Sequence, residues 1–274
     1  MDSGITVVER GEPISGIRGP SRNEASRIFD RIARRYDLLN RLLSFGGDVL
    51  WRKQMARYLL PRHDQYVLDL ATGTADQILA LFETSDKVKC GIGMDLAEKM
   101  LEIGRRKVEK RGLSNVITLK VGDAMDIPAH DCQFDAVTIS FGIRNVIDVR
   151  RALLEMYRVL KPGGRILILE FSLPYNSFIG GVVLLYLRHV LPHLGAFVSR
   201  DSYAYQYLNE TIETFPYGEA FCDLLRAASF SAVKAHPFWL GFPMIYQGDR
   251  PASAVKVPIT ASSLHFDMDE TSAH

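Results

Sequence analysis

A short apolar run that ends at small residues is the first feature of this sequence that could serve chemistry. The run 66–70 stops just before Gly73, and a helical pattern follows. A buried parallel strand ends in this way when its turn must let a ligand approach the backbone. A second apolar run, 88–94, ends in Asp95, whose carboxylate could accept hydrogen bonds from a ribose diol. Together these features predict a site for an adenosine-containing cofactor.

The turn after the first run distinguishes two classes of nucleotide site. A dinucleotide dehydrogenase uses Gly-x-Gly-x-x-Gly, so that a pyrophosphate can lie at a helix N-terminus. This sequence has Ala71, Gly73 and Ala75 at alternate positions and no glycine three residues after Gly73. The spacing from Asp69 to Gly73 suits a methionine tail better. The carboxylate can receive the amino group, directly or through water, and Gly73 lets the methionine chain lie on the backbone.

Further positions extend this hypothesis to the rest of the cofactor. Asp123 and Ala124 follow the apolar run 116–121, where a short acidic residue can meet the exocyclic amine of adenine. Ser140 ends the run 134–140, at the point where the strand order of such a sheet reverses. Each residue alone is equally typical of a turn or a cap, but in this order they indicate a class I methyltransferase that uses S-adenosylmethionine. The predicted cofactor residues are Asp69, Gly73, Thr74, Asp95, Asp123, Ala124 and Ser140.

The elements that would position these residues alternate along the chain. Short apolar runs predict strands, and amphipathic patterns between them predict helices. The predicted strands are 66–70, 88–94, 116–121, 134–140, 164–171, 230–237 and 242–247, and the predicted helices are 75–83, 97–111, 148–159 and 217–228. This alternation predicts an α/β fold, with a Rossmann-like, mostly parallel sheet and helices on both faces.

One domain is predicted over residues 23–248. Helical patterns occupy 23–60, ahead of the first strand, and a helical insertion at about 175–215 precedes the last strands. The segments 1–22 and 249–274 mix glycine, proline and charged residues without periodicity, so both are predicted to be mobile tails.

Composition and charge limit the partners and the compartment. The 274 residues are 47% hydrophobic and 24% charged, and the net charge of +1 gives no reason to expect nucleic-acid binding. Three scattered cysteines lack metal-ligand spacing and suit a reducing compartment, so no metal site is expected. The N-terminus lacks a secretory pattern, and the apolar stretch 178–198 is too interrupted to span a membrane. These features predict a cytoplasmic protein.

The strand that ends at Ser140 leads directly into the run 141–146, Phe-Gly-Ile-Arg-Asn-Val. This run and four other blocks resemble the UbiE-type C-methyltransferases of ubiquinone and menaquinone biosynthesis, over roughly residues 25–248. The other blocks lie at 29–40, 44–53, 156–174 and 189–192. The resemblance implies an S-adenosylmethionine-dependent enzyme that methylates a ring carbon of a polyprenylated quinol.

Such a reaction, as the resemblance implies it, needs a phenolate next to the attacked carbon. The enzyme must therefore favour ring deprotonation and hold the carbon in line with the sulfonium methyl. Arg144 is predicted to stabilise the phenolate, or to order a water that takes the proton, because a guanidinium stays charged. Asn145 is predicted to orient it. The alternative is that Arg144 caps a helix or pairs structurally with a carboxylate.

Three more side chains are predicted at the acceptor pocket. Tyr36, with Asp37, could close over the cofactor from the N-terminal helices, or could serve only to pack a helix on the sheet. Phe141 opens the signature run beside Ser140. His189 has the chemistry of a general base, but its apolar segment favours a hydrogen-bonded structural histidine.

A long isoprenoid tail requires an apolar route. Residues 178–190 form a nearly uninterrupted apolar stretch, which we expect to line a tail channel and to contact the membrane surface. The alternative is a helix buried in the core or in a homodimer.

Two other functions stay open at the level of sequence. Ala75 stands where the resembled family usually has glycine, and 241–246 differs from its usual C-terminal strand. These departures fit a methyltransferase that acts on another aromatic or lipid acceptor. A catalytically silent scaffold of a quinone-synthesis complex is the third hypothesis, and the complete set of predicted cofactor residues argues against it.

Overall fold

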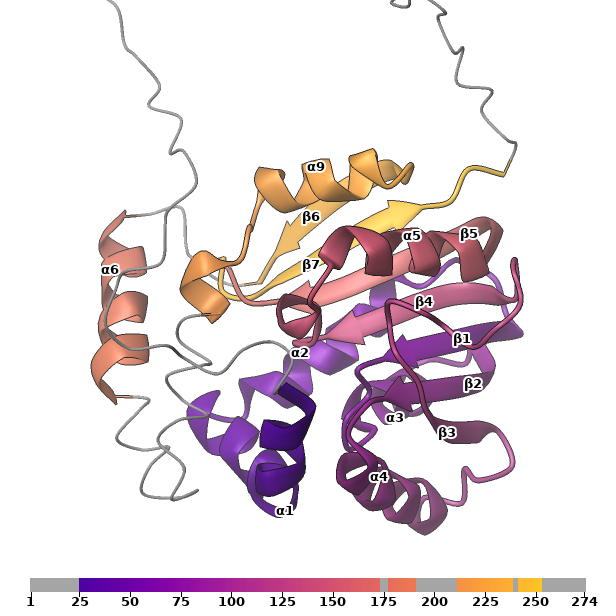
Figure 1. Cartoon of the computed structure of the whole chain (residues 1–274), viewed down its shortest axis with the longest axis horizontal. Helices are drawn as coiled ribbons and strands as arrows, with labels where there is room; N and C mark the ends of the chain where they lie inside the picture. Colours follow the sequence, from indigo (N-terminus) through magenta and orange to yellow (C-terminus); the bar gives the residue numbers. More distant parts are fainter. Residues whose placement is uncertain (1–24, 173–176, 191–210, 239–240, 253–274) are drawn as a thin grey trace, which may run out of the picture.

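The computed structural model describes residues 25–172, 177–190, 211–238 and 241–252 of the chain. In this part of the chain a seven-stranded sheet forms the centre of the molecule (Figure 1), and its strands lie in the order β3-β2-β1-β4-β5-β7-β6. The strands are β1 (Gln65–Leu70), β2 (Val88–Asp95), β3 (Ile117–Val121), β4 (Phe134–Ser140), β5 (Leu160–Glu170), β6 (Ser231–Pro237) and β7 (Met244–Asp249).

The first five strands pair in parallel, and β7 is antiparallel to both of its neighbours, β5 and β6. The central strands are continuous apolar runs because both of their faces are covered, and every residue of β4 is buried. The prediction of a mostly parallel α/β sheet is confirmed. Because the carboxyl ends of parallel strands share one edge, the segments after β1, β2, β3 and β4 meet there.

Helices cover both faces of this sheet (Figure 1). In β1, Leu68 packs in the same core as α5 and α9, whereas its neighbour Val67 packs with Met55 of α2 and Leu81 of α3. Successive residues of a strand point to opposite faces, so these two cores lie on opposite sides of the sheet. The helices concerned are α2 (Gly47–Met55), α3 (Asp76–Thr84), α4 (Glu98–Lys110), α5 (Val149–Val159) and α9 (Glu219–Ala227).

The N-terminal helices and the insertion also form as predicted within the described residues. The long helix α1 (Ala25–Leu43) precedes α2, and the insertion contains α6 (Ser177–Leu185) followed by the π-helical turn η4 (Tyr186–Val190). Val183 and Tyr186 of the insertion pack with Leu39 of α1. No described helix is both long and apolar enough to cross a membrane.

The C-terminal boundary differs from the predicted one. The strand expected at 242–247 continues to Asp249, which forms an ion pair with Arg165 of β5 at 2.6 Å. Arg250 donates to three backbone carbonyls, including that of Leu160. The start of the segment 249–274 is therefore packed on the sheet. The predictions made for residues 1–22, for 191–210 of the insertion and for 253–274 lie outside the described residues.

Candidate active site

A cavity opens at the edge of the sheet where β1, β2, β3 and β4 end. Phe29 and Tyr36 of α1 contribute to its wall. Of the predicted cofactor residues, those that line the cavity are Gly73, Asp95, Asp123, Ala124 and Ser140. Of the predicted acceptor residues, those that line it are Tyr36, Phe141 and Asn145. Residues far apart in the sequence thus share one wall because the parallel strands end together.

The turn after β1 is tied to the tip of β2. The Gly73 amide donates to Asp95 Oδ2 at 2.8 Å, and the Ala97 amide donates to Oδ1 at 2.8 Å. Gly73 has a φ of 54°, in the left-handed region that favours glycine. Burial raises the pKa of Asp95 above its ordinary value, although these backbone hydrogen bonds oppose the rise. The carboxylate is therefore held in a fixed position at the cavity.

Asp69 lies behind this turn and does not line the cavity. Its Oδ1 accepts from the Thr138 hydroxyl and its Oδ2 from the Thr72 hydroxyl, both at 2.6 Å. The side chain is fully buried, and burial raises its pKa to about 6 despite both hydrogen bonds. The direct contact with a ligand amino group that the spacing suggested is thus not available in this geometry. The carboxylate instead fastens the turn to β4.

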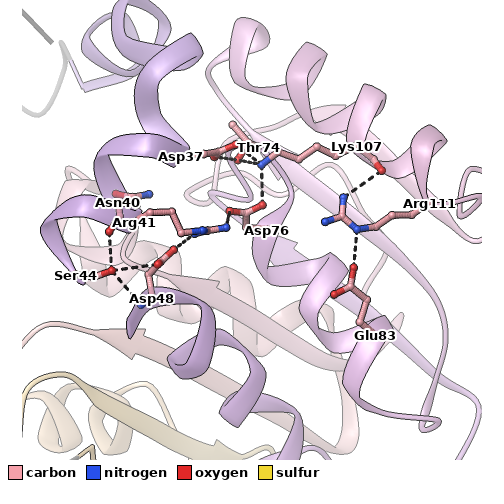
Figure 2. A network of polar contacts seen from close by, with 10 residues as sticks. All are labelled: Asp37, Asn40, Arg41, Ser44, Asp48, Thr74, Asp76, Glu83, Lys107 and Arg111. Carbon is pink, nitrogen blue, oxygen red and sulfur yellow. Dashed lines mark hydrogen bonds and ion pairs between the residues drawn. The ribbon is translucent and has the colours of Figure 1, made fainter. Parts of the chain in front are cut away.

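The Thr74 side chain takes part in a polar network (Figure 2). Its hydroxyl donates to Asp37 Oδ1 at 2.6 Å and accepts from Lys107 Nζ at 2.8 Å. The side chain is buried and does not line the cavity. The side chain therefore links the β1–α3 turn to α1, and the cofactor contact of Thr74 stays a prediction.

Lys107 of α4 lies at the centre of this network (Figure 2). Its Nζ is 2.5 Å from Asp37 Oδ2 and 2.7 Å from Asp76 Oδ1, while Arg41 pairs with both Asp76 and Asp48. Burial raises the pKa of Asp76, but the charge and hydrogen bond of Lys107 outweigh it and leave the pKa below its ordinary value. These ion pairs join α1 to α2, α3 and α4, so they hold the helix that carries Phe29 and Tyr36 beside the cavity.

Phe141 begins the signature run with an unusual backbone conformation. Its φ of 56° is left-handed, and its amide donates to the Leu169 carbonyl at 2.7 Å. Such strain in a residue other than glycine concentrates at functional sites. The ring packs against Phe171 at a centroid distance of 4.5 Å, and Phe171 stacks on Phe242 at 5.0 Å. The cavity is therefore next to a cluster of flat aromatic surfaces.

Arg144 does not line the cavity, and its alternative structural role is the one found. Its Nη1 donates to Glu170 Oε1 at 2.6 Å and to the Phe141 carbonyl at 2.8 Å. Both partners of the ion pair are buried. In this geometry the guanidinium is neutralised by Glu170, so it is not available to a phenolate in the cavity. It fixes the 3-10 turn η3 (Ile143–Asn145) against β5.

Asn145 and Ser140 keep the positions that the sequence suggested. Asn145 lines the cavity, and its side-chain Oδ1 is buried without a hydrogen-bond partner. Ser140 lines it too, and its hydroxyl donates to Gln77 Oε1 of α3 at 2.8 Å. His189 differs, since it is exposed on η4 and is not among the lining residues.

Two groups of side chains near the cavity were not predicted from the sequence. One is the ion-pair network centred on Lys107, and the other is the buried pair Gln77 and Arg52, linked by a bond from Gln77 Nε2 to the Arg52 carbonyl at 3.3 Å. The sequence signals were that Asp37 belongs to the block 29–40 and Arg52 to the block 44–53. Their pairing was not predictable, because burial and pairing of such side chains depend on contacts between distant segments.

Comparisons with known proteins identify the family. The chain matches the model of the ubiE/COQ5 methyltransferase family over residues 20–249. It is 46% identical over 224 residues to the demethylmenaquinone methyltransferase of Thermus thermophilus, a match that covers 82% of this chain and 100% of the relative. The ubiquinone/menaquinone biosynthesis C-methyltransferase UbiE of Geotalea daltonii is 39% identical, with 89% of this chain and 99% of the relative covered.

Solved structures agree on the fold. A SAM-dependent methyltransferase from Thermotoga maritima has a TM-score of 0.58 at 23% identity, covering 82% of this chain and 98% of that one. The [4+2]-cyclase SpnF has the same TM-score at 16% identity, with 88% and 100% covered. Because this fold carries different reactions, the fold alone does not decide the activity. The family match does: the chain belongs to the ubiE/COQ5 methyltransferase family and is a methyltransferase.

Proposed function

We propose that this protein transfers the methyl group of S-adenosylmethionine to a ring carbon of a polyprenylated quinol, with demethylmenaquinol as the first acceptor to test. The observation that carries the proposal is the similarity to relatives named demethylmenaquinone methyltransferase, over the whole length of each relative and at 46% and 40% identity. The cavity at the carboxyl ends of the strands supports it, because this edge is where such sheets bind ligands.

The lining residues fit the cofactor. Asp95 stands at the tip of β2 where a ribose diol would be recognised, and Asp123 follows β3 at the position proposed for adenine. Gly142 has no room for a side chain, because a Cβ there would lie 2.5 Å from Ala71 Cβ. Asn145 offers an unused oxygen at the same wall. When bound, S-adenosylmethionine supplies the electrophilic methyl group.

On the acceptor side, the aromatic cluster of Phe141, Phe171 and Phe242 suits a planar quinol ring. In this proposal Asn145 is the polar group of the signature that meets the acceptor or its water. Arg144 acts through position: by binding Glu170 and the Phe141 carbonyl, it keeps η3 and Asn145 at the cavity wall.

The isoprenoid tail of the acceptor would bring the protein to a lipid surface. Large apolar side chains are exposed at the end of α1, and the most exposed is Phe45, at 84%. Leu38 and Leu42 lie one turn apart on the same helix, and Leu50 follows on α2 beside the exposed Lys53. Apolar side chains beside cations favour an anionic bilayer as the partner of this surface.

Labelling tests the reaction. The protein is incubated with methyl-labelled S-adenosylmethionine and with reduced prenylated naphthoquinols and benzoquinols, and the oxidised quinones serve as controls because their rings are not nucleophilic. Label on a ring carbon of a naphthoquinol is the expected result. Label on a benzoquinol alone would change the acceptor, and no label on any quinol while S-adenosylhomocysteine still binds would refute the quinol proposal.

A further inference from the structure

Arg52 of α2 is a buried cation that has no counter-ion in contact among the residues that the structure describes. It is 6% exposed, and it lies on the buried face of the helix with Asp48 and Met55. Asp48 pairs with Arg41, but within the described residues the guanidinium of Arg52 has neither an ion pair nor a hydrogen bond, and its Nε is buried without a partner. Arg144, the other arginine that is almost fully buried, has Glu170 at 2.6 Å.

A buried guanidinium without a carboxylate partner is unfavourable, because its cation–π contact with Phe141 compensates the loss of hydration only in part. The positive charge of Arg52 acts on two carboxylates, Asp69 and Asp76. It opposes the rise that burial causes in the pKa of Asp69, and it contributes to the lowered pKa of Asp76. Both are already occupied, Asp69 by two threonine hydroxyls and Asp76 by Lys107 and Arg41. The fold therefore provides a positive charge beside the β1–α3 turn, and no carboxylate of the described residues forms an ion pair with it.

Two contacts relate Arg52 to the cavity. Its Cζ lies 5.3 Å from the ring centroid of Phe141, which lines the cavity. Its carbonyl accepts from Gln77, and Gln77 in turn accepts from the hydroxyl of Ser140, a second lining residue. Arg52 itself does not line the cavity. Its guanidinium lies behind the ring of Phe141, close enough to Asp69 and Asp76 for its charge to act on both, and these flank the turn on which the methionine tail of the proposed cofactor would rest.

We propose that Arg52 binds the α-carboxylate of the methionine part of S-adenosylmethionine. A carboxylate is planar and carries one negative charge, so it matches the parallel N–H groups of a guanidinium. This inference rests on the proposed use of that cofactor and names the side chain that holds one of its ends. Arg52 is then a binding residue of the cofactor, while the nearby Asp69 shapes the turn.

Calorimetric titration tests the proposal without any turnover. The ligands are S-adenosylhomocysteine, its decarboxylated analogue, and 5′-methylthioadenosine, which lacks the whole amino-acid end. Arg52→Gln should lower the affinity for S-adenosylhomocysteine by about tenfold to a hundredfold, which is the range expected for the loss of a hydrogen bond to a charged group. The same variant should bind the other two ligands like the wild type. Arg52→Lys keeps the charge but lacks the two parallel N–H groups, so its affinity for S-adenosylhomocysteine should lie between those of the wild type and Arg52→Gln. The matched control is Arg57→Gln, because Arg57 is exposed on the same part of the chain.

The comparison of ligands protects the test against a folding defect. In the wild-type protein alone, S-adenosylhomocysteine must bind about tenfold or more tightly than its decarboxylated analogue. Equal affinities there, or an equal loss for both ligands in Arg52→Gln, would overturn the carboxylate subsite. If S-adenosylhomocysteine does not bind the wild type, the cofactor proposal fails as well, whereas binding without quinol methylation would refute only the proposed acceptor.

Discussion

Replacing Lys107 with methionine should loosen α1 at the cavity. Methionine keeps the apolar stem of the side chain but removes the charge, so the contacts with Asp37 at 2.5 Å and Asp76 at 2.7 Å are lost together. Arg41 still pairs with Asp76, but Asp37 then keeps only its bond with Thr74 among the contacts described above. Two carboxylates are left close to each other with less positive charge between them.

The size of the effect follows from burial. An exposed ion pair stabilises a protein by about 1 kcal/mol or less, whereas removing one partner of a fully buried pair costs about 3–5 kcal/mol. The side chains of Lys107 and Asp76 are 20% and 13% exposed, and that of Asp37 is 32% exposed. We therefore expect Lys107→Met to lower the free energy of unfolding by about 2 kcal/mol, between these limits.

Arg111→Met is the matched control. Arg111 lies one helical turn after Lys107, at the C-terminal end of α4, and it pairs with Glu83. Both of these side chains are about 40% exposed. Its loss should cost about 0.5 kcal/mol or less. Urea denaturation followed by circular dichroism gives both values, and hydrogen exchange shows whether the amides of α1 become less protected while those of β1 and β4 do not.

The cofactor should report the same change. Phe29 and Tyr36 of α1 line the cavity. If the packing of α1 is weakened by about 2 kcal/mol, the affinity for S-adenosylhomocysteine can fall by up to about 30-fold. Equal stability of Lys107→Met and Arg111→Met would refute the idea that the network holds α1 in place. A loss of stability spread evenly over the sheet, with α1 no more exposed to exchange than before, would also refute it.

Three further predictions concern the turn, the cavity and the surface. Burial raises the folded pKa of Asp69 to about 6, so wild-type stability relative to Asp69→Asn should fall by about 3 kcal/mol as the pH rises from about 3 to 7; denaturation at each pH measures this. Gly142→Ala should clash with Ala71, lowering stability by about 1–3 kcal/mol and reducing the thermal shift given by S-adenosylhomocysteine. Phe45→Glu should reduce co-sedimentation with anionic vesicles without changing the melting temperature.

The order of elements was predictable from the sequence because it depends on local patterns. β4 is apolar at both faces and α5 has an amphipathic stripe, so their types could be assigned from neighbours in the chain. The placement of β7 between β5 and β6 was not predictable, since the antiparallel pairing of β7 with β5 joins segments more than seventy residues apart. The tip of β2 and the turn after β3 were identified because an acidic residue directly follows an apolar run.

The turn after β1 shows a limit of a different kind. Ala75 has a φ of 67°, which explains why glycine is usual at this position in the resembled family. The methyl group is nevertheless fully buried in the core between α3 and α4. Burying a methyl group stabilises by about 0.8 kcal/mol, which offsets much of the strain of about 1–2 kcal/mol. The replacement of the usual glycine by Ala75 therefore affects the packing between α3 and α4. Ala75 does not line the cavity.

The two buried arginines show why residue type alone did not identify the roles within the site. Arg144 belongs to the most specific part of the signature, yet Glu170, on another strand, neutralises it. Arg52 carries the same charge in a less specific block, and it has no such partner within the described residues. A guanidinium can attract a ligand only where the protein has not already supplied an anion. The pairing of each arginine depends on contacts between distant segments, so the charge left for an incoming anion is that of Arg52.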